Sequence, residues 1–135
     1  MTNKITDIEG IGPSYAEKLV AAQITTTEHL LQKCGSAKGR KSVAQATGVS
    51  ESTLLKWANM ADVMRISGVG SQYAELLEAA GVDTIKELRT RNVENLVAKM
   101  NEINAEKKLT RGSATVASVT KWIDQAKSMD PMITH

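Results

Sequence analysis

Two short glycine-containing segments are the parts of this 135-residue sequence best suited to bind a ligand. Ile8-Glu9-Gly10-Ile11-Gly12 and Ile66-Ser67-Gly68-Val69-Gly70 share the pattern apolar-x-Gly-apolar-Gly, and each leads into a helix-compatible run. Glycine permits a positive φ and the close approach of a partner. A glycine turn at the start of a helix also leaves main-chain amides pointing outward, where the positive end of the helix dipole favours an anion such as phosphate.

The two segments belong to an internal repeat with a constant offset of 58 residues. From residue 8 to residue 30, 11 of 23 positions are identical to their counterparts in the second copy. Pro13 suits the first position of a helix, because its missing N–H is no loss there. Lys18 of the first copy is replaced by Leu76 in the second. The second copy is therefore expected to be the poorer phosphate binder, and a purely structural role as a corner between helices is the alternative for both.

A basic segment follows the first copy of the repeat. Residues 33–41 carry four positive charges and no negative charge. Neutralising phosphates releases counterions, so such a segment favours nucleic-acid contacts. The alternative is an ordinary solvated loop and helix start. In the second half, Lys107, Lys108 and Arg111 take a similar place in the chain.

Apolar residues recur at helical spacing throughout the chain, and no strand pattern is present. We expect an all-α fold of about nine or ten short helices. The predicted helical regions are a lead-in turn at 4–9, then 13–22, a helix capped within 25–27 that runs through Leu30 and Leu31, a helix pair within 42–64, then 71–80, 84–88, 93–103 and 113–127. Trp57 and Trp122 lie on apolar helical stripes, which predicts that both are core residues. They are 65 residues apart, whereas the glycine segments are 58 apart, so the second half has gained seven residues between its glycine segment and its tryptophan.

The pattern Ala44-x-x-x-Gly48-Val49-Ser50, followed by Leu54 and Trp57, has the spacing of a helix-turn-helix. Such a helix pair could place its second helix in a DNA major groove. The expected accessible positions, Glu51, Ser52, Thr53, Lys56 and Asn59, include only one positive charge. Packing without base reading is therefore the preferred interpretation.

Composition excludes several other classes of protein. The formal net charge is +2, far below that of a protein that coats nucleic acid by charge alone. One cysteine and two histidines cannot build a zinc site, and no catalytic set of side chains or cluster of carboxylates is present, so we expect no metal, no cofactor and no enzyme activity. The lack of an apolar run of about 20 residues and of a signal peptide predicts a soluble cytoplasmic protein without membrane contact.

The glycine segments resemble the helix-hairpin-helix motif, and residues 8–134 resemble an uncharacterised family of small soluble proteins with tandem domains of that kind. The residues that carry the resemblance are Ile8-Glu-Gly-Ile-Gly-Pro, Lys38-Gly-Arg-Lys, Thr47-Gly-Val-Ser, Leu55-Lys-Trp-Ala-Asn-Met-Ala-Asp, Ile66-Ser-Gly-Val-Gly, Leu76-Leu-Glu-Ala-Ala-Gly-Val-Asp-Thr and Lys121-Trp-Ile. The resemblance implies a compact all-α fold in which hairpin amides grip a phosphate without reading bases. It also implies that Ile11 and Val69 plug the core.

The sequence thus predicts tandem helix-hairpin-helix repeats in one compact multi-helix domain, with halves at 1–65 and 66–130 and a loose tail at 131–135. The predicted function is non-enzymatic, sequence-independent binding of nucleic acid, DNA in the first place. The predicted binding residues are Gly10, Ile11, Gly12, Ser14, Lys18, Lys38, Arg40, Lys41, Gly68, Val69, Gly70 and Ser71. A protein-interaction or adaptor module is the alternative function, and a helix-turn-helix regulator is a third. DNA or RNA, single or double strand, the protein partner and the oligomeric state all stay open at this stage.

Overall fold

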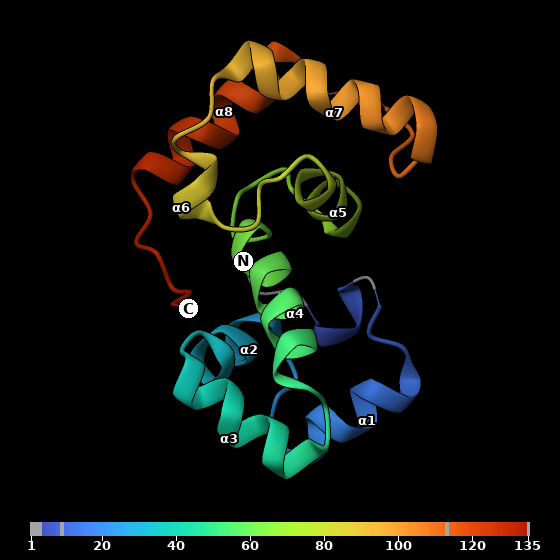
Figure 1. Cartoon of the computed structure of the whole chain (residues 1–135), viewed down its shortest axis with the longest axis vertical. Coiled ribbons are helices and arrows are strands. Elements are labelled where there is room, and N and C mark those ends of the chain that lie inside the picture. The colour runs from blue at the N-terminus through green and yellow to red at the C-terminus, as the bar shows by residue number, and fades with distance from the viewer. Residues whose placement is uncertain (1–3, 9, 113, 135) are drawn as a thin grey trace.

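The computed structural model describes residues 4–8, 10–112 and 114–134, and the regular elements in these ranges are all helices (Figure 1). The only β-type pairing there is an isolated bridge between Lys4 and Thr26. The elements are a 3-10 helix η1 (Ile5–Asp7) and the α-helices α1 (Pro13–Ala21), α2 (Thr27–Cys34), α3 (Ala37–Thr47), α4 (Glu51–Val63), α5 (Ser71–Ala79), α6 (Ile85–Leu88), α7 (Val93–Lys107) and α8 (Val116–Lys127). The all-α class is confirmed. None of these helices combines the length and the apolar character needed to cross a membrane.

Side-chain caps fix where most of these helices begin. An N-cap side chain accepts a hydrogen bond from a first-turn amide in α2, α3, α4, α6, α7 and α8, through Thr26, Ser36, Ser50, Thr84, Asn92 and Thr115. Such caps satisfy donors that the helix itself leaves unpaired. Helices α1 and α5 differ, because their N-cap residues are glycines without a capping side chain.

The structure corrects several predicted boundaries. The last helix starts at Val116 and not at Ser113, because Thr115 caps it; Ser113 itself lies outside the described residues. Helix α7 continues past Ile103 to Lys107, through residues that favour helix, and ends at Lys108 with a φ of 53°. Within the described ranges, the eight α-helices and one 3-10 helix make nine helical elements, in agreement with the nine or ten short helices expected.

The central helix α4 joins the two halves of the chain. In Figure 1, α1, α2 and α3 lie on one side of α4, and α5 to α8 lie on the other. Buried apolar residues from both halves form one hydrophobic cluster, which includes Trp57 and Trp122 at 3% and 5% exposure. Both tryptophans are therefore core residues, as their place on the apolar stripes predicts.

A buried carboxylate reinforces the junction between the halves. Asp62, near the end of α4, is only 1% exposed. Its Oδ1 accepts a bond of 2.8 Å from Arg65 Nη1, and its Oδ2 accepts one of 2.9 Å from the main-chain N–H of Ile85. A buried charge is tolerated where it is paired and hydrogen-bonded. Asp62 therefore fixes the start of α6 against the end of α4.

The C-terminal segment is docked and not loose. The main-chain N–H of Thr134 donates to the carbonyl oxygen of Gly35 at 2.7 Å, and Ile133 is buried. Arg65 Nη1 also donates to the carbonyl oxygen of Asp130 at 3.0 Å. Pro131 stops α8 from continuing, as expected, but the residues after it return to the first half of the chain (Figure 1).

Removing the Asp62 carboxylate tests this junction. Asp62→Ala is expected to lower the free energy of unfolding by about 2 to 3 kcal/mol, because the Ile85 amide and the Arg65 guanidinium both lose a charged partner. Urea unfolding followed by circular dichroism measures the change. Asp124→Ala, at an exposed position of α8, is the control and should shift stability by less than about 0.5 kcal/mol. Equal stability of the two variants would contradict the role given to Asp62.

Candidate functional site

The two glycine segments fold into turns with the same main-chain geometry. Gly10 and Gly68 both have a φ of +96°. The N–H of Ile11 donates to the carbonyl of Ile8 at 3.2 Å, and the N–H of Val69 donates to that of Ile66 at 3.1 Å. Ile11 and Val69 are 5% and 4% exposed, so the residue between the glycines is a core residue in both copies.

The first glycine of each turn has an internal reason to be glycine. A φ of +96° is unfavourable for residues with a side chain. A Cβ at Gly10 would lie 3.5 Å from Trp57 Nε1, and a Cβ at Gly68 would lie 3.2 Å from Trp122 Nε1. The same indoles pack against Tyr15 and Tyr73, with ring centroids 5.0 and 5.2 Å apart. Each turn thus packs against a tryptophan from a later helix of its own half.

Neither the dihedral angles nor an internal contact requires glycine at the second glycine position of each turn. Gly12 (φ −83°, ψ −177°) and Gly70 (φ −93°, ψ −172°) are extended, a conformation that any residue adopts. A Cβ built on either would meet no atom within 4 Å. Serine, threonine, asparagine or aspartate is usual at an N-cap, and the other α-helices of the described chain use such residues. At Gly12 and Gly70 the space in front of the helix is left open.

The open helix starts differ in the number of amides they present. Helix α5 has main-chain N–H groups at Ser71, Gln72 and Tyr73, before the first α-helical bond from Ala74 to the carbonyl of Gly70. Helix α1 begins with Pro13, which has no N–H, so Ser14 and Tyr15 supply its first-turn donors. Amides in a first helical turn point along the axis toward an approaching anion. The second turn is therefore the richer donor.

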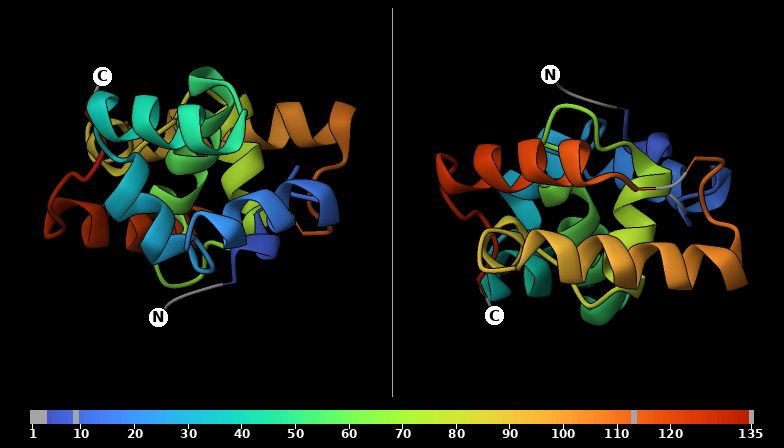
Figure 2. Two further views of the ribbon diagram at one scale, coloured as in Figure 1. Left: turned by 90° about the horizontal axis from the view of Figure 1, so that it is seen from below. Right: turned by 90° about the horizontal axis from the view of Figure 1, so that it is seen from above.

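The basic segment of the first half does not adjoin the first turn. Lys38 and Lys41 are exposed in the first half of α3. Figure 1 and the left view of Figure 2 place the N-terminal end of α3 on the opposite side of the molecule from that of α1. Lys18, on α1 itself, is the predicted cation that stays close to the turn, and its Nζ lies 5.7 Å from the centroid of the Tyr15 ring.

Arg40, predicted as a surface cation, is a buried structural residue. It is 5% exposed, and its Nη1 donates to the carbonyl oxygens of Cys34 and Gly35, each at 3.0 Å. Its Nη2 donates to the carbonyl oxygen of Thr134 at 2.6 Å. The last carbonyls of α2 lack helical partners and carry partial negative charge, which explains why a guanidinium settles there.

The second turn has cations beside it that our predicted set of binding residues did not include. A hollow of about 570 Å³ is lined by Gln72 of α5 together with Lys108, Arg111 and other residues around the α7–α8 connection. A Cβ at Gly112 would lie 3.6 Å from the hydroxyl of Tyr73, so the connection passes directly over this side of α5. The signal in the sequence is the basic connection of the second half, where Lys107, Lys108 and Arg111 stand.

A second hollow, of about 340 Å³, is lined by the residues of the same turn. It is lined by Arg65, by residues 66–70 and by Gln125 of α8. Gln125 Oε1 accepts from the N–H of Ser67 at 3.0 Å, and its Nε2 donates to the carbonyl of Ser67 at 3.4 Å. This side-chain amide holds the main chain of the turn in place.

The helix-turn-helix pattern is a packing feature in this fold. Gly48 has a φ of +77° and Ser50 caps α4, as the spacing predicts. From Trp57 to Met64, however, every residue except Asn59 is buried. The exposed residues of α4 are Glu51, Ser52 and Lys56, all in its first two turns. The second half of α4 therefore packs in the core, and only its first two turns are accessible to a partner.

Other reactive groups do not assemble into a site. Burial raises the pKa of the Cys34 thiol to about 11, which keeps it protonated and unreactive. Burial also raises the pKa of Glu78, against the opposing effect of Lys56. Within the described ranges, no three His, Cys, Asp or Glu side chains gather closely enough to hold a metal ion.

Comparison with known proteins gives a family and no function. Residues 9–129 match the family described as "Domain of unknown function (DUF4332)". No curated protein and no solved structure matches the chain. The matched span contains both glycine turns, α1 to α7 and the whole of α8. The chain belongs to the DUF4332 family.

Proposed function

We propose that this protein binds nucleic acid, DNA in the first place, through backbone phosphates and without catalysing a reaction. The observation that carries the proposal is the state of α1 and α5, which begin at Gly12 and Gly70 with no side-chain cap and open space in front. Six other helices of the chain fill that position with a capping side chain. A glycine without an internal role is explained if an external group approaches its main chain.

We interpret both turns as helix-hairpin-helix motifs in tandem. A glycine at positive φ, a buried apolar residue and an extended glycine precede a helix in each copy. A phosphate in front of α1 or α5 would accept main-chain hydrogen bonds and meet the positive end of the helix dipole. Such contacts involve the backbone of the nucleic acid, so they carry no sequence information.

The surroundings favour the second turn as the main phosphate site, which reverses the ranking drawn from the sequence. Three amides precede Ala74, and Lys108 and Arg111 line the hollow that Gln72 borders. The first turn supplies two amides and Lys18. Because the exposed Lys38 and Lys41 lie away from the first turn, they would contact nucleic acid only if it ran over the surface of α3.

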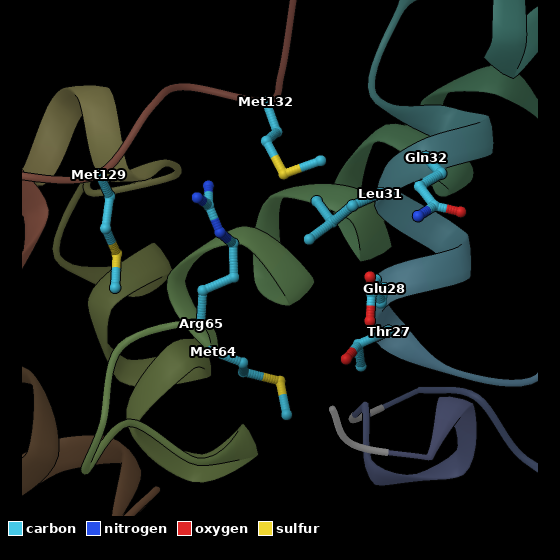
Figure 3. Close-up of a pocket in the computed structure, with 8 residues that line it drawn as sticks. All are labelled: Thr27, Glu28, Leu31, Gln32, Met64, Arg65, Met129 and Met132. Atoms are coloured by element: carbon cyan, nitrogen blue, oxygen red, sulfur yellow. The ribbon is translucent and has the colours of Figure 1, made fainter. Parts of the chain in front are cut away.

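A protein-interaction module is the second candidate function. Figure 3 shows a hollow of about 320 Å³ between α2, the end of α4 and the C-terminal segment. Three methionines and Leu31 contribute to its walls, with Arg65 and Gln32 among its polar residues. Methionine adapts to differently shaped apolar partners. The hollow therefore favours this alternative if nucleic acid does not bind.

Salt dependence is the first test of phosphate binding. Fluorescence anisotropy with labelled duplex and single-stranded DNA is expected to show binding that differs little between sequences. A contact to about 3 to 5 phosphates gives a log–log slope of about −3 to −5 against salt concentration. If no binding occurs at low salt, both turns are structural corners and the interaction module is the function to pursue.

Filling the open N-cap separates binding from stability. In Gly70→Asp the carboxylate caps α5 and occupies the amides, so the free energy of unfolding should stay equal or rise by a few tenths of a kcal/mol to about 1 kcal/mol. DNA affinity should fall on the order of tenfold, because the charge-assisted bonds to phosphate are lost. Gln45→Glu, at an exposed position of α3, makes the same charge change and should affect affinity less. Equal affinity of these two variants would place the ligand elsewhere.

The position of the cations gives a separate test. The double variant Lys108→Glu, Arg111→Glu should weaken DNA binding more than Lys38→Glu, Lys41→Glu, although both change the charge equally. The expected reason is that only the first pair lies beside an open helix start. The salt slope should become shallower by about 1 to 2 in the first variant, since up to two phosphate contacts disappear. The opposite order of affinities would favour the basic segment of α3 as the binding surface.

A further inference from the structure

We propose that residues 130–134 form a detachable strap, a segment of the chain's second half that binds a preformed site at the α2–α3 corner of the first half. Figure 1 shows the segment leaving α8 and running to the vicinity of α2 and α3. This inference does not depend on nucleic-acid binding.

The corner receives the segment through its main chain. The N–H of Thr134 donates to the carbonyl of Gly35 at 2.7 Å. A Cβ at residue 35 would overlap the carbonyl oxygens of Met132 and of Leu31, although Gly35 has an ordinary helical φ of −66°. Glycine is needed there both by the end of α2 itself and by the strap, which lies directly against it. The site therefore matches an extended segment more than a particular side chain.

Arg40 is the donor that completes the site. Its guanidinium is buried and joins the two last carbonyls of the α2 turn, Cys34 and Gly35, to the carbonyl of Thr134. A planar guanidinium can donate several hydrogen bonds in fixed directions. Two of the three acceptors belong to the corner itself, so Arg40 stays anchored when the strap leaves.

The other end of the strap is attached to the junction of the halves. Arg65 Nη1 donates to the carbonyl of Asp130 and to Asp62 Oδ1. Between the two attachments, Met132 borders the hollow of Figure 3, across from Leu31 of α2. The strap thus crosses the gap between the halves and forms one wall of this hollow.

The attachment is weaker than the packing of the helices. Ile133 is the one buried side chain of the strap, at 8% exposure, whereas Asp130, Pro131, Met132 and Thr134 are exposed. The hydrogen bonds that hold the strap are one between main-chain groups, from Thr134 to Gly35, and one each from the guanidinium groups of Arg40 and Arg65. Segments with few buried apolar contacts open locally at a lower free energy than the whole fold. Opening would remove the Met132 wall and widen the methionine-lined hollow.

The test compares two substitutions at one position of the full-length chain. Thr134→Pro removes the N–H that donates to Gly35, whereas Thr134→Ala keeps it and is the matched control. Hydrogen exchange followed by mass spectrometry should show the residues around Gly35 exchanging about tenfold faster in the proline variant, as the loss of such a bond implies. The alanine variant should exchange like the unmodified protein, and α5 and α7 should stay unchanged in both.

A second variant keeps the test independent of proline geometry. Arg40→Gln keeps the Thr134 N–H and should accelerate its exchange about as strongly, with α5 and α7 again unchanged. Equal exchange around Gly35 in the two Thr134 variants would overturn the proposal. So would acceleration that spreads to α5 and α7, because the segment would then be an inseparable part of the global fold. A strap that already exchanges without protection in the unmodified protein would also overturn it.

Discussion

The contact of each glycine turn with a tryptophan is the constraint on which the rest of this fold depends. Gly10 lies against Trp57 and Gly68 against Trp122, so closely that the indole nitrogen is the first atom a Cβ would meet. Each indole also packs against a tyrosine from the helix that follows the turn. Aromatic side chains bury a large area and prefer such edge-to-face or tilted pairs. In each half, the tryptophan thus fixes the turn and the direction of the next helix, and it ties both to the last helix of the repeat unit.

The two halves keep this unit and differ in what surrounds it. In the first half, α3 and α4 follow α2 directly, and the basic segment lies at the start of α3, away from the first glycine turn. In the second half, the long helix α7 and the α7–α8 connection return to α5 and bring Lys108 and Arg111 with them. The two halves therefore share the turn and differ in which cations lie near the start of the helix that follows it.

Local signals in the sequence predicted most of the helices and the two buried tryptophans, and the resemblance to the helix-hairpin-helix motif implied the buried Ile11 and Val69. These features follow from periodicity and from turn and capping residues, which act over a few positions. Arg40 and the C-terminal segment were missed for a different reason. Arg40 is 94 positions from Thr134, and nothing in a basic run shows which of its members will meet a buried carbonyl. Likewise, only tertiary structure shows that Lys108 and Arg111 lie beside Gln72.

The glycines of this chain fall into two groups, those that the fold requires and those that it does not. Gly10 and Gly68 are explained by positive φ and the nearby indole, and Gly35 by the overlap that a Cβ would have with the Met132 and Leu31 carbonyls. Those residues would be glycine in a protein that bound nothing. Gly12 and Gly70 have ordinary dihedral angles and empty space, and a capping side chain there would satisfy the first-turn amides as well or better. Because the fold does not require these two glycines, they are the observation on which the proposal of a phosphate site at the helix starts rests.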